Sequence, residues 1–121
     1  MKCVTNDARL VTVASTYSAM NATDAQLYAE RNAVENLLFK GIAGCYEQPL
    51  VTKEAESMQA HAAFYDWLIT KREYERFITD RKLEVNSKKK KQVNITETIT
   101  FDVPALRKEM ERQGVIKKLG F

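Results

Sequence analysis

Polar and apolar residues alternate most regularly in the segment "QVNITETITF", residues 92–101. Val93, Ile95, Ile99 and Phe101 fall on one side of an extended chain, and asparagine and threonine fall on the other. This two-residue period, rich in β-branched residues, predicts a strand with one buried face. Glu97 interrupts the apolar side of the pattern.

Two other segments carry strand patterns. "RLVTVAST" (residues 9–16) alternates before a polar turn, and "LEVN" (83–86) alternates before a run of lysines. Because only a short polar segment separates 83–86 from 92–101, these two strands are predicted to form an antiparallel hairpin.

A helix is predicted from about Asp24 to Lys40. Thr23 and Gln26 have the spacing of a capping box, and Gly41 is suited to end the helix. One stripe of the helix is made of small residues, which predicts close packing on a sheet, and a second stripe is bulkier. The small stripe is Ala22, Ala25, Ala29 and Ala33, continued by Leu37; the bulkier one is Leu27, Val34 and Leu38.

The stretch from Thr52 to Lys82 is helical in pattern and contains neither glycine nor proline. One straight helix of this length would extend roughly 45 Å, at ~1.5 Å per residue, and would exceed the width of a compact domain. Its apolar residues also change face part-way along. The pattern therefore predicts two consecutive helices, with a break near Thr70 to Arg72.

A last helix is predicted from Asp102, which can cap it, through Gln113, with Pro104 in the first turn and Gly114 at its end. Together these elements predict a single α+β domain over residues 1–121, in the order β-α-α-α-β-β-α. The expected architecture is a small three-stranded sheet with a β-hairpin and helices packed on one face.

Composition supports a folded chain. The 121 residues are 45% hydrophobic and 29% charged, as in an ordinary globular domain. There is no apolar run of the ~20 residues that a transmembrane helix needs. The first ten residues lack the apolar core of a signal peptide, so no export signal is expected in the sequence as given.

Two cysteines and one histidine, His61, are too few for a zinc framework. Cys3 and Cys45 leave two alternatives. We favour two unpaired thiols, with Cys45 partly buried, because free cysteine often behaves as a small apolar residue. In an oxidising compartment the two would be able to form one disulfide.

Four consecutive lysines, Lys88, Lys89, Lys90 and Lys91, form the candidate binding site. Without them the formal net charge falls from +3 to −1. We interpret them first as the hydrated tip of the predicted hairpin, where lysine discourages edge-to-edge association. The alternative is contact with phosphates or anionic lipids. Four engaged phosphates would give a log–log salt slope of roughly −3 to −4, enough for nonspecific attraction and too little for sequence recognition.

The sequence has none of the GxSxG, P-loop or GxGxxG patterns of common enzyme and nucleotide sites. Asp66, Glu73 and Glu75 are interpreted as surface partners of neighbouring lysine and arginine residues. We therefore predict a protein that is not an enzyme, with no catalytic residue, no cofactor and no metal ligand.

The segments "VTVASTYSA", "DAQLYAERNAVENLLFKGIAG", "YERFI" and "ITFDVPALRKEMERQGVIKKLGF" together resemble a family of small, uncharacterised bacterial proteins that are exported or associated with the cell envelope. More distantly, the first strand and helix resemble the N-terminal domain of the flagellar H/T-ring protein and related small outer-membrane lipoproteins. The resemblance implies an assembly or scaffolding role. It also implies a periplasmic or envelope location, reached after removal of a signal peptide outside this sequence; a cytoplasmic location is the alternative.

Three functions are compared. The first is a non-enzymatic cell-envelope interaction domain that binds a protein through a sheet edge or through the C-terminal "VIKKLGF". The second is a weak binder of nucleic acid or an anionic surface through the four lysines. The third is a small-molecule binder or enzyme, which would require a deep pocket combining Trp67 or Tyr74 with converging polar groups.

Overall fold

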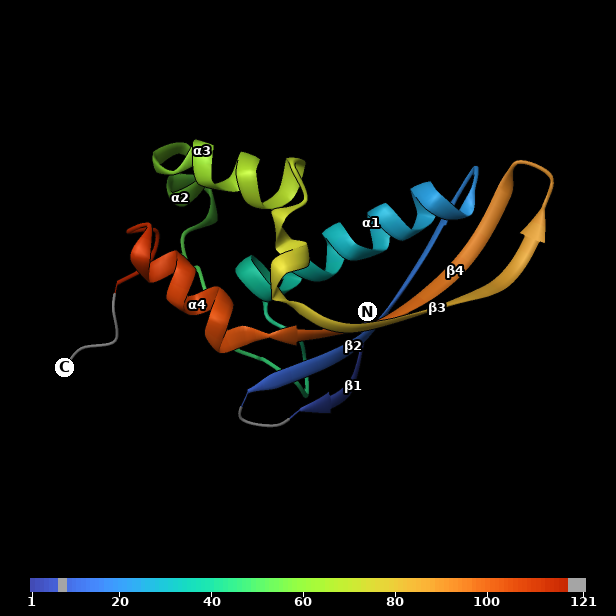
Figure 1. Cartoon of the computed structure of the whole chain (residues 1–121), viewed down its shortest axis with the longest axis horizontal. Helices are drawn as coiled ribbons and strands as arrows, with labels where there is room; N and C mark the ends of the chain where they lie inside the picture. Colours follow the sequence, from blue (N-terminus) through green and yellow to red (C-terminus); the bar gives the residue numbers. More distant parts are fainter. Residues whose placement is uncertain (7–8, 118–121) are drawn as a thin grey trace.

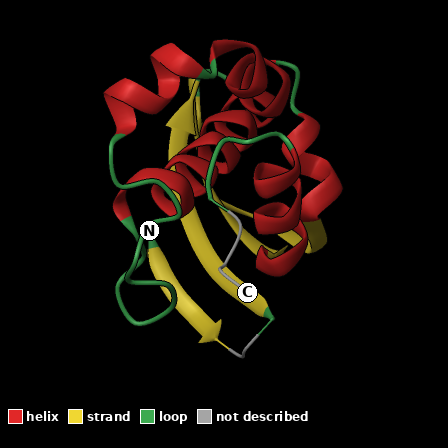
Figure 2. Ribbon diagram, turned by 90° about the vertical axis from the view of Figure 1, so that its left-hand side faces the viewer, coloured by secondary structure: helices red, strands yellow, loops and turns green. Residues whose placement is uncertain are grey.

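A four-stranded antiparallel sheet forms the centre of the protein, with strand order β1-β2-β4-β3. The computed structural model describes residues 1–6 and 9–117. Helix α1 lies along one face of the sheet, and α2, α3 and α4 gather at the end opposite the β3–β4 turn (Figures 1 and 2). In order, the elements are β1 (Lys2–Asn6), β2 (Leu10–Ala19), α1 (Ala22–Glu35), the π-helical turn η1 (Asn36–Lys40), α2 (Glu54–Ala60), α3 (Ala62–Tyr65), the π-helical turn η2 (Asp66–Thr70), the 3-10 helix η3 (Glu73–Phe77), β3 (Ile78–Lys89), β4 (Gln92–Asp102) and α4 (Val103–Arg112).

The α+β class is confirmed, but the predicted three-stranded sheet and element order are wrong. The missing strand is β1, which precedes β2 and pairs with it in antiparallel fashion. Its short sequence has no clear alternation of its own, so its extended conformation comes from pairing with a neighbouring strand. The strands before α1 are therefore two, and the order begins β-β-α.

Strand β4 follows its predicted alternation. Its apolar side is buried beneath the helices, and the threonine side is partly exposed. Beside it, β2 pairs over its whole length, from Leu10 opposite Asp102 to Ala19 opposite Val93. The central strands β2 and β4 thus provide the buried face of the sheet, and the outer strands β1 and β3 pair on either side of them.

Helix α1 packs on the sheet through its alanine stripe, as predicted. Ala25, Ala29 and Ala33 have no exposed surface, and the Ser15 hydroxyl of β2 donates a hydrogen bond to the Ala29 carbonyl at 2.8 Å. The predicted cap is wrong. Asn21, rather than Thr23, accepts the Asp24 amide hydrogen at 2.8 Å, since its side-chain oxygen lies three residues before that amide.

Gly41 ends this helical segment because no other residue fits there. Its φ is 79°, and a Cβ atom at this position would lie 2.3 Å from the backbone oxygen of Glu47. The chain then turns back on itself, with a bridge between Ile42 and Tyr46. This turn brings Cys45 to strand β1.

Cys45 forms a disulfide with Cys3, with the two Cα atoms 5.5 Å apart. The favoured prediction of two unpaired thiols is therefore wrong. The pairing of β1 with β2 places Cys3 opposite Val13, beside the turn that carries Cys45. The disulfide fastens the edge strand β1 to the segment that follows η1.

The predicted break near Thr70 to Arg72 is confirmed, because Arg72 adopts a left-handed conformation with φ 61°. A second interruption, at His61, separates α2 from α3. The prediction of helix up to Lys82 is wrong. From Ile78 the chain is extended, because it pairs with β4 starting at Phe101.

The predicted start of the last helix, α4, is confirmed. The Asp102 side chain accepts the Ala105 amide hydrogen at 3.1 Å, and Pro104 lies in the first turn. The proposed contact segment "VIKKLGF" extends beyond Lys117, so its last four residues lie outside the described residues.

Candidate functional site

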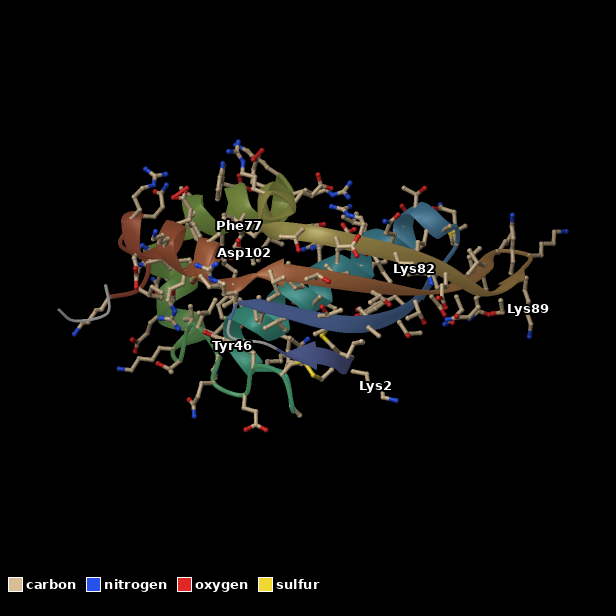
Figure 3. All side chains as sticks on the ribbon, turned by 60° about the horizontal axis from the view of Figure 1, so that its bottom comes forward. Lys2, Tyr46, Phe77, Lys82, Lys89 and Asp102 are labelled. Atoms are coloured by element: carbon tan, nitrogen blue, oxygen red, sulfur yellow. A yellow bond between two sulfur atoms is a disulfide. The ribbon has the colours of Figure 1, made fainter. Side chains whose placement is uncertain are left out.

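The four lysines occupy the tip of the β3–β4 hairpin, as predicted. Lys88 and Lys89 end β3, and Lys90 and Lys91 form the turn before Gln92 begins β4. All four are exposed, and Lys89 lies at the far end of the molecule from α4 (Figure 3). The cluster is an open cationic tip.

None of these four ammonium groups forms an ion pair with a carboxylate of the described part of the chain. Their charge is therefore balanced by solvent ions. Four adjacent cations of this kind attract an anionic surface and repel a second cationic tip.

Strand β3 is a free edge of the sheet, since its only strand neighbour in the described chain is β4. Every side chain after Ile78 is exposed, including Leu83 at 40% and Val85 at 54%. A long edge strand presents backbone donors and acceptors on which another strand can pair. We call residues 80–85 the β3 edge.

Irregular pairing bounds the β3 edge on both sides. The register with β4 shifts between Ile78 and Asp80 and again between Val85 and Ser87. Between these shifts, each residue advances by one against β4, so the β3 edge is a regular strand of six residues. Helix α1 packs on β2 and β4, and this leaves the outer side of β3 uncovered (Figure 1).

Two glutamates are completely buried between α1 and the sheet, and sequence reasoning missed this pair. Glu30 of α1 and Glu97 of β4 both have 0% exposed surface. Gln26 connects them, because its side-chain amide donates to Glu97 Oε2 at 2.8 Å and to Glu30 Oε2 at 3.5 Å. The only sequence signal was Glu97, which interrupts the apolar side of β4.

Glu30 is well supplied with donors. The Tyr74 hydroxyl donates to its Oε1 at 2.9 Å, and the guanidinium groups of Arg72 and Arg81 lie 3.3 and 3.1 Å from its oxygens. These partners come from two segments, the start of η3 and strand β3. Two guanidinium groups and a hydroxyl thus surround the buried Glu30 oxygens with hydrogen-bond donors.

Among the described residues, Glu97 has fewer hydrogen-bond donors around it than Glu30 has. Its Oε1 is buried without a hydrogen-bond partner among the described residues. Burial raises the pKa of Glu97 to about 7; the neighbouring Glu30 adds to the rise, and the Gln26 amide opposes it. The Glu97 side chain is therefore a neutral carboxylic acid in mildly acidic solution.

The buried pair is not arranged for catalysis on an external substrate, because neither carboxyl group is exposed. The surface carboxylates singled out from sequence stay apart: Asp66 faces Lys71, Glu73 pairs with Arg76, and Glu75 pairs with Arg72. Among the described residues, no cluster of histidine, cysteine, aspartate and glutamate has the geometry to hold a metal ion.

Trp67 and Tyr74, whose place in a deep pocket would have supported the third function, make other contacts. Tyr74 is 1% exposed and directs its hydroxyl to Glu30. Trp67 packs on Phe64, and the Arg76 guanidinium lies 5.7 Å from the centre of its ring. One open hollow lies elsewhere, between the α2 region and Val115, and is lined by Ser57 and His61 among others.

Comparison with protein-family models, curated proteins and solved structures found no match to this chain. No helix in the described ranges is both long and apolar enough to cross a membrane.

Proposed function

We propose that the chain is a non-enzymatic interaction or assembly domain of the bacterial cell envelope, and that it binds a protein partner through the β3 edge. The observation that carries this proposal is the regular, uncovered strand with exposed Leu83 and Val85. In strand addition, backbone hydrogen bonds supply affinity and alternate side chains supply specificity. The uncovered edge of β3 offers both backbone hydrogen-bonding groups and exposed side chains.

The disulfide supports the envelope part of the proposal. Bonds such as Cys3–Cys45 persist in oxidising compartments, including the bacterial periplasm, and are rare in the reducing cytoplasm. Rapid acid quenching of cells followed by thiol alkylation checks this. The oxidised protein should carry no alkyl group on either cysteine, and alkylation of both in unstressed cells would contradict an envelope location.

A photo-crosslinking amino acid at Leu83 tests the contact surface. Met58 is the matched control, because both side chains are 40% exposed and Met58 lies on α2, away from the edge. Irradiation of intact cells should yield a discrete cross-linked protein with the probe at Leu83 and none with the probe at Met58. No product at Leu83, or the same product from both positions, would overturn the proposal.

Binding of nucleic acid or an anionic surface through the cationic tip is the second candidate. It is favoured by four exposed lysines that form no ion pair with a carboxylate in the described part of the chain. Replacing Lys88, Lys89, Lys90 and Lys91 by serine should abolish binding to duplex, single strand or anionic vesicles. A control with the same loss of charge replaces four exposed lysines of the body: Lys40, Lys53, Lys71 and Lys108. Equal loss in both variants would show that only net charge matters.

A further inference from the structure

We infer that the partner at the β3 edge is a second copy of this chain, paired antiparallel with Leu83 opposite Leu83. This inference rests on the proposed role of the β3 edge as the contact surface. Its basis is the order of charges along the strand. In this register Lys82 of each copy lies opposite Glu84 of the other, so the symmetric pair contains two attractive charge pairs.

Symmetry restricts the registers to be considered. A two-fold axis perpendicular to the sheet keeps α1 of both copies on one side, and residues directly opposite each other then project to the same face. Pairing with β4 shows that Arg81, Leu83 and Val85 share the face covered by α1, whereas Lys82 and Glu84 share the other. Each allowed register therefore places one residue of the β3 edge opposite its own copy.

The other registers are unfavourable for stated reasons. Centring the pair on any charged residue of the β3 edge (80, 81, 82 or 84) places two like charges directly opposite each other, which destabilises a sheet. Centring it on Val85 runs the contact through the register shift that follows that residue. The Leu83-centred register uses residues 81–85 of both copies, and these lie within the regular segment.

On the face of the sheet covered by α1, this register also brings together side chains that can pack on each other. Leu83 meets Leu83, and Arg81 of each copy meets Val85 of the other. Arg81 is already paired with Glu30 at 3.1 Å, so its charge is compensated within its own chain and its alkyl stem can cover the valine. The contact removes water from Leu83 and Val85, which are otherwise exposed apolar residues on an edge.

Charge reversal tests the register. The Lys82 and Glu84 side chains are 75% and 59% exposed, so Lys82→Glu and Glu84→Lys should leave the fold intact, as circular dichroism can verify. An interface of about five residues per strand is small, and sedimentation equilibrium should find a wild-type dimer with Kd between about 1 µM and 1 mM. Each single variant should weaken this dimer about tenfold or more, because two attractive pairs become repulsive.

Mixing the two variants is the decisive measurement. In a mixed pair, glutamate at 82 and 84 of one copy faces lysine at 84 and 82 of the other, so a heterodimer should form at wild-type affinity or tighter. Lys108→Glu and Glu47→Lys are matched controls, because they make the same charge changes at exposed positions outside β3 and should leave self-association unchanged.

Each result has a defined meaning. A monomeric wild type up to about 1 mM would overturn the inference, because even a weak edge contact associates at that concentration. Loss of dimer in the single variants without recovery in the mixture would overturn the register. If the wild type is monomeric but Leu83 still cross-links to a different protein in cells, the proposed function stands and only the identity of the partner fails.

Discussion

Glu97 makes the stability of the fold depend on pH. Its folded-state pKa, about 7, lies above its ordinary value of 4.5. The folded protein therefore holds this proton more tightly than the unfolded chain does, and the contribution of Glu97 is fully present below about pH 4.5. That contribution is lost as the pH rises through 7, when the buried group must ionise beside Glu30.

Glu97→Gln should remove this dependence, because glutamine has the shape of the protonated acid and can still accept the Gln26 hydrogen bond. The free energy of unfolding of the variant should be close to that of the wild type at pH 4. At pH 8 it should be higher by about 3 kcal/mol. Urea unfolding at both pH values measures this. Glu54→Gln, at an exposed site, is the control, and a constant difference between wild type and Glu97→Gln at both pH values would contradict the assignment.

Gly41 is a second position where one residue decides the local structure. Gly41→Ala should destabilise the fold by about 2 kcal/mol or more, from a left-handed backbone and a clash with the Glu47 carbonyl. Gly114→Ala separates the two causes, since Gly114 has φ 74° but nothing within 4 Å of an added Cβ. It should cost only about 1 kcal/mol. Equal losses in urea unfolding would show that the close approach contributes nothing.

At the scale of helices and strands, the sequence pattern correctly predicted the features that depend on residues close together in the chain. The alternation of β4, the alanine stripe of α1 and the cap at Asp102 all depend on residues a few positions apart, and all three are confirmed. The segment 78–82 has no strong alternation and becomes a strand only because β4 is available beside it. Such non-local pairing overrides helical propensity and is invisible in the segment itself.

The candidate site likewise has one feature that the sequence could predict and one that it could not. The lysine hairpin was predictable, because both strands and the turn lie in one short stretch. The environment of Glu97 was not, because its hydrogen-bond partner Gln26 comes from α1, 71 positions away in sequence. A glutamate on an apolar side indicated only that some polar partner was needed.

The tip of the hairpin carries a testable element-scale feature in Lys91, whose φ is 63°. Lys91→Gly should stabilise the protein by up to about 1 kcal/mol, because glycine adopts this conformation without steric cost. Lys90→Gly is the matched control: it removes the same charge from the same turn, and the backbone of Lys90 is not in the left-handed region. It should be neutral or destabilising. Thermal unfolding compares the two, and equal shifts in Tm would contradict the explanation.

At the scale of the whole molecule, the two edge strands of the sheet differ in length and in how they are fastened to the rest of the protein. Strand β1 is short and is tied down by the Cys3–Cys45 disulfide, whereas β3 is long and uncovered. One edge strand is thus tethered covalently to the turn that carries Cys45, and the other has no such tether among the described residues. Within the described chain, β3 is therefore the long, untethered edge at which the sheet can be extended.

The disulfide should contribute to the stability of the entire domain, because it joins residues 42 apart and limits the unfolded chain. Replacing both cysteines by alanine should lower the free energy of unfolding by about 4 kcal/mol in the loop-entropy description. Urea unfolding of wild type and variant, each with and without reductant, measures it. Reductant should bring the wild type to the stability of the variant and leave the variant unchanged. A variant as stable as the oxidised wild type would show that β1 is held by strand pairing alone, and the contrast between a tethered and an open edge would then fail.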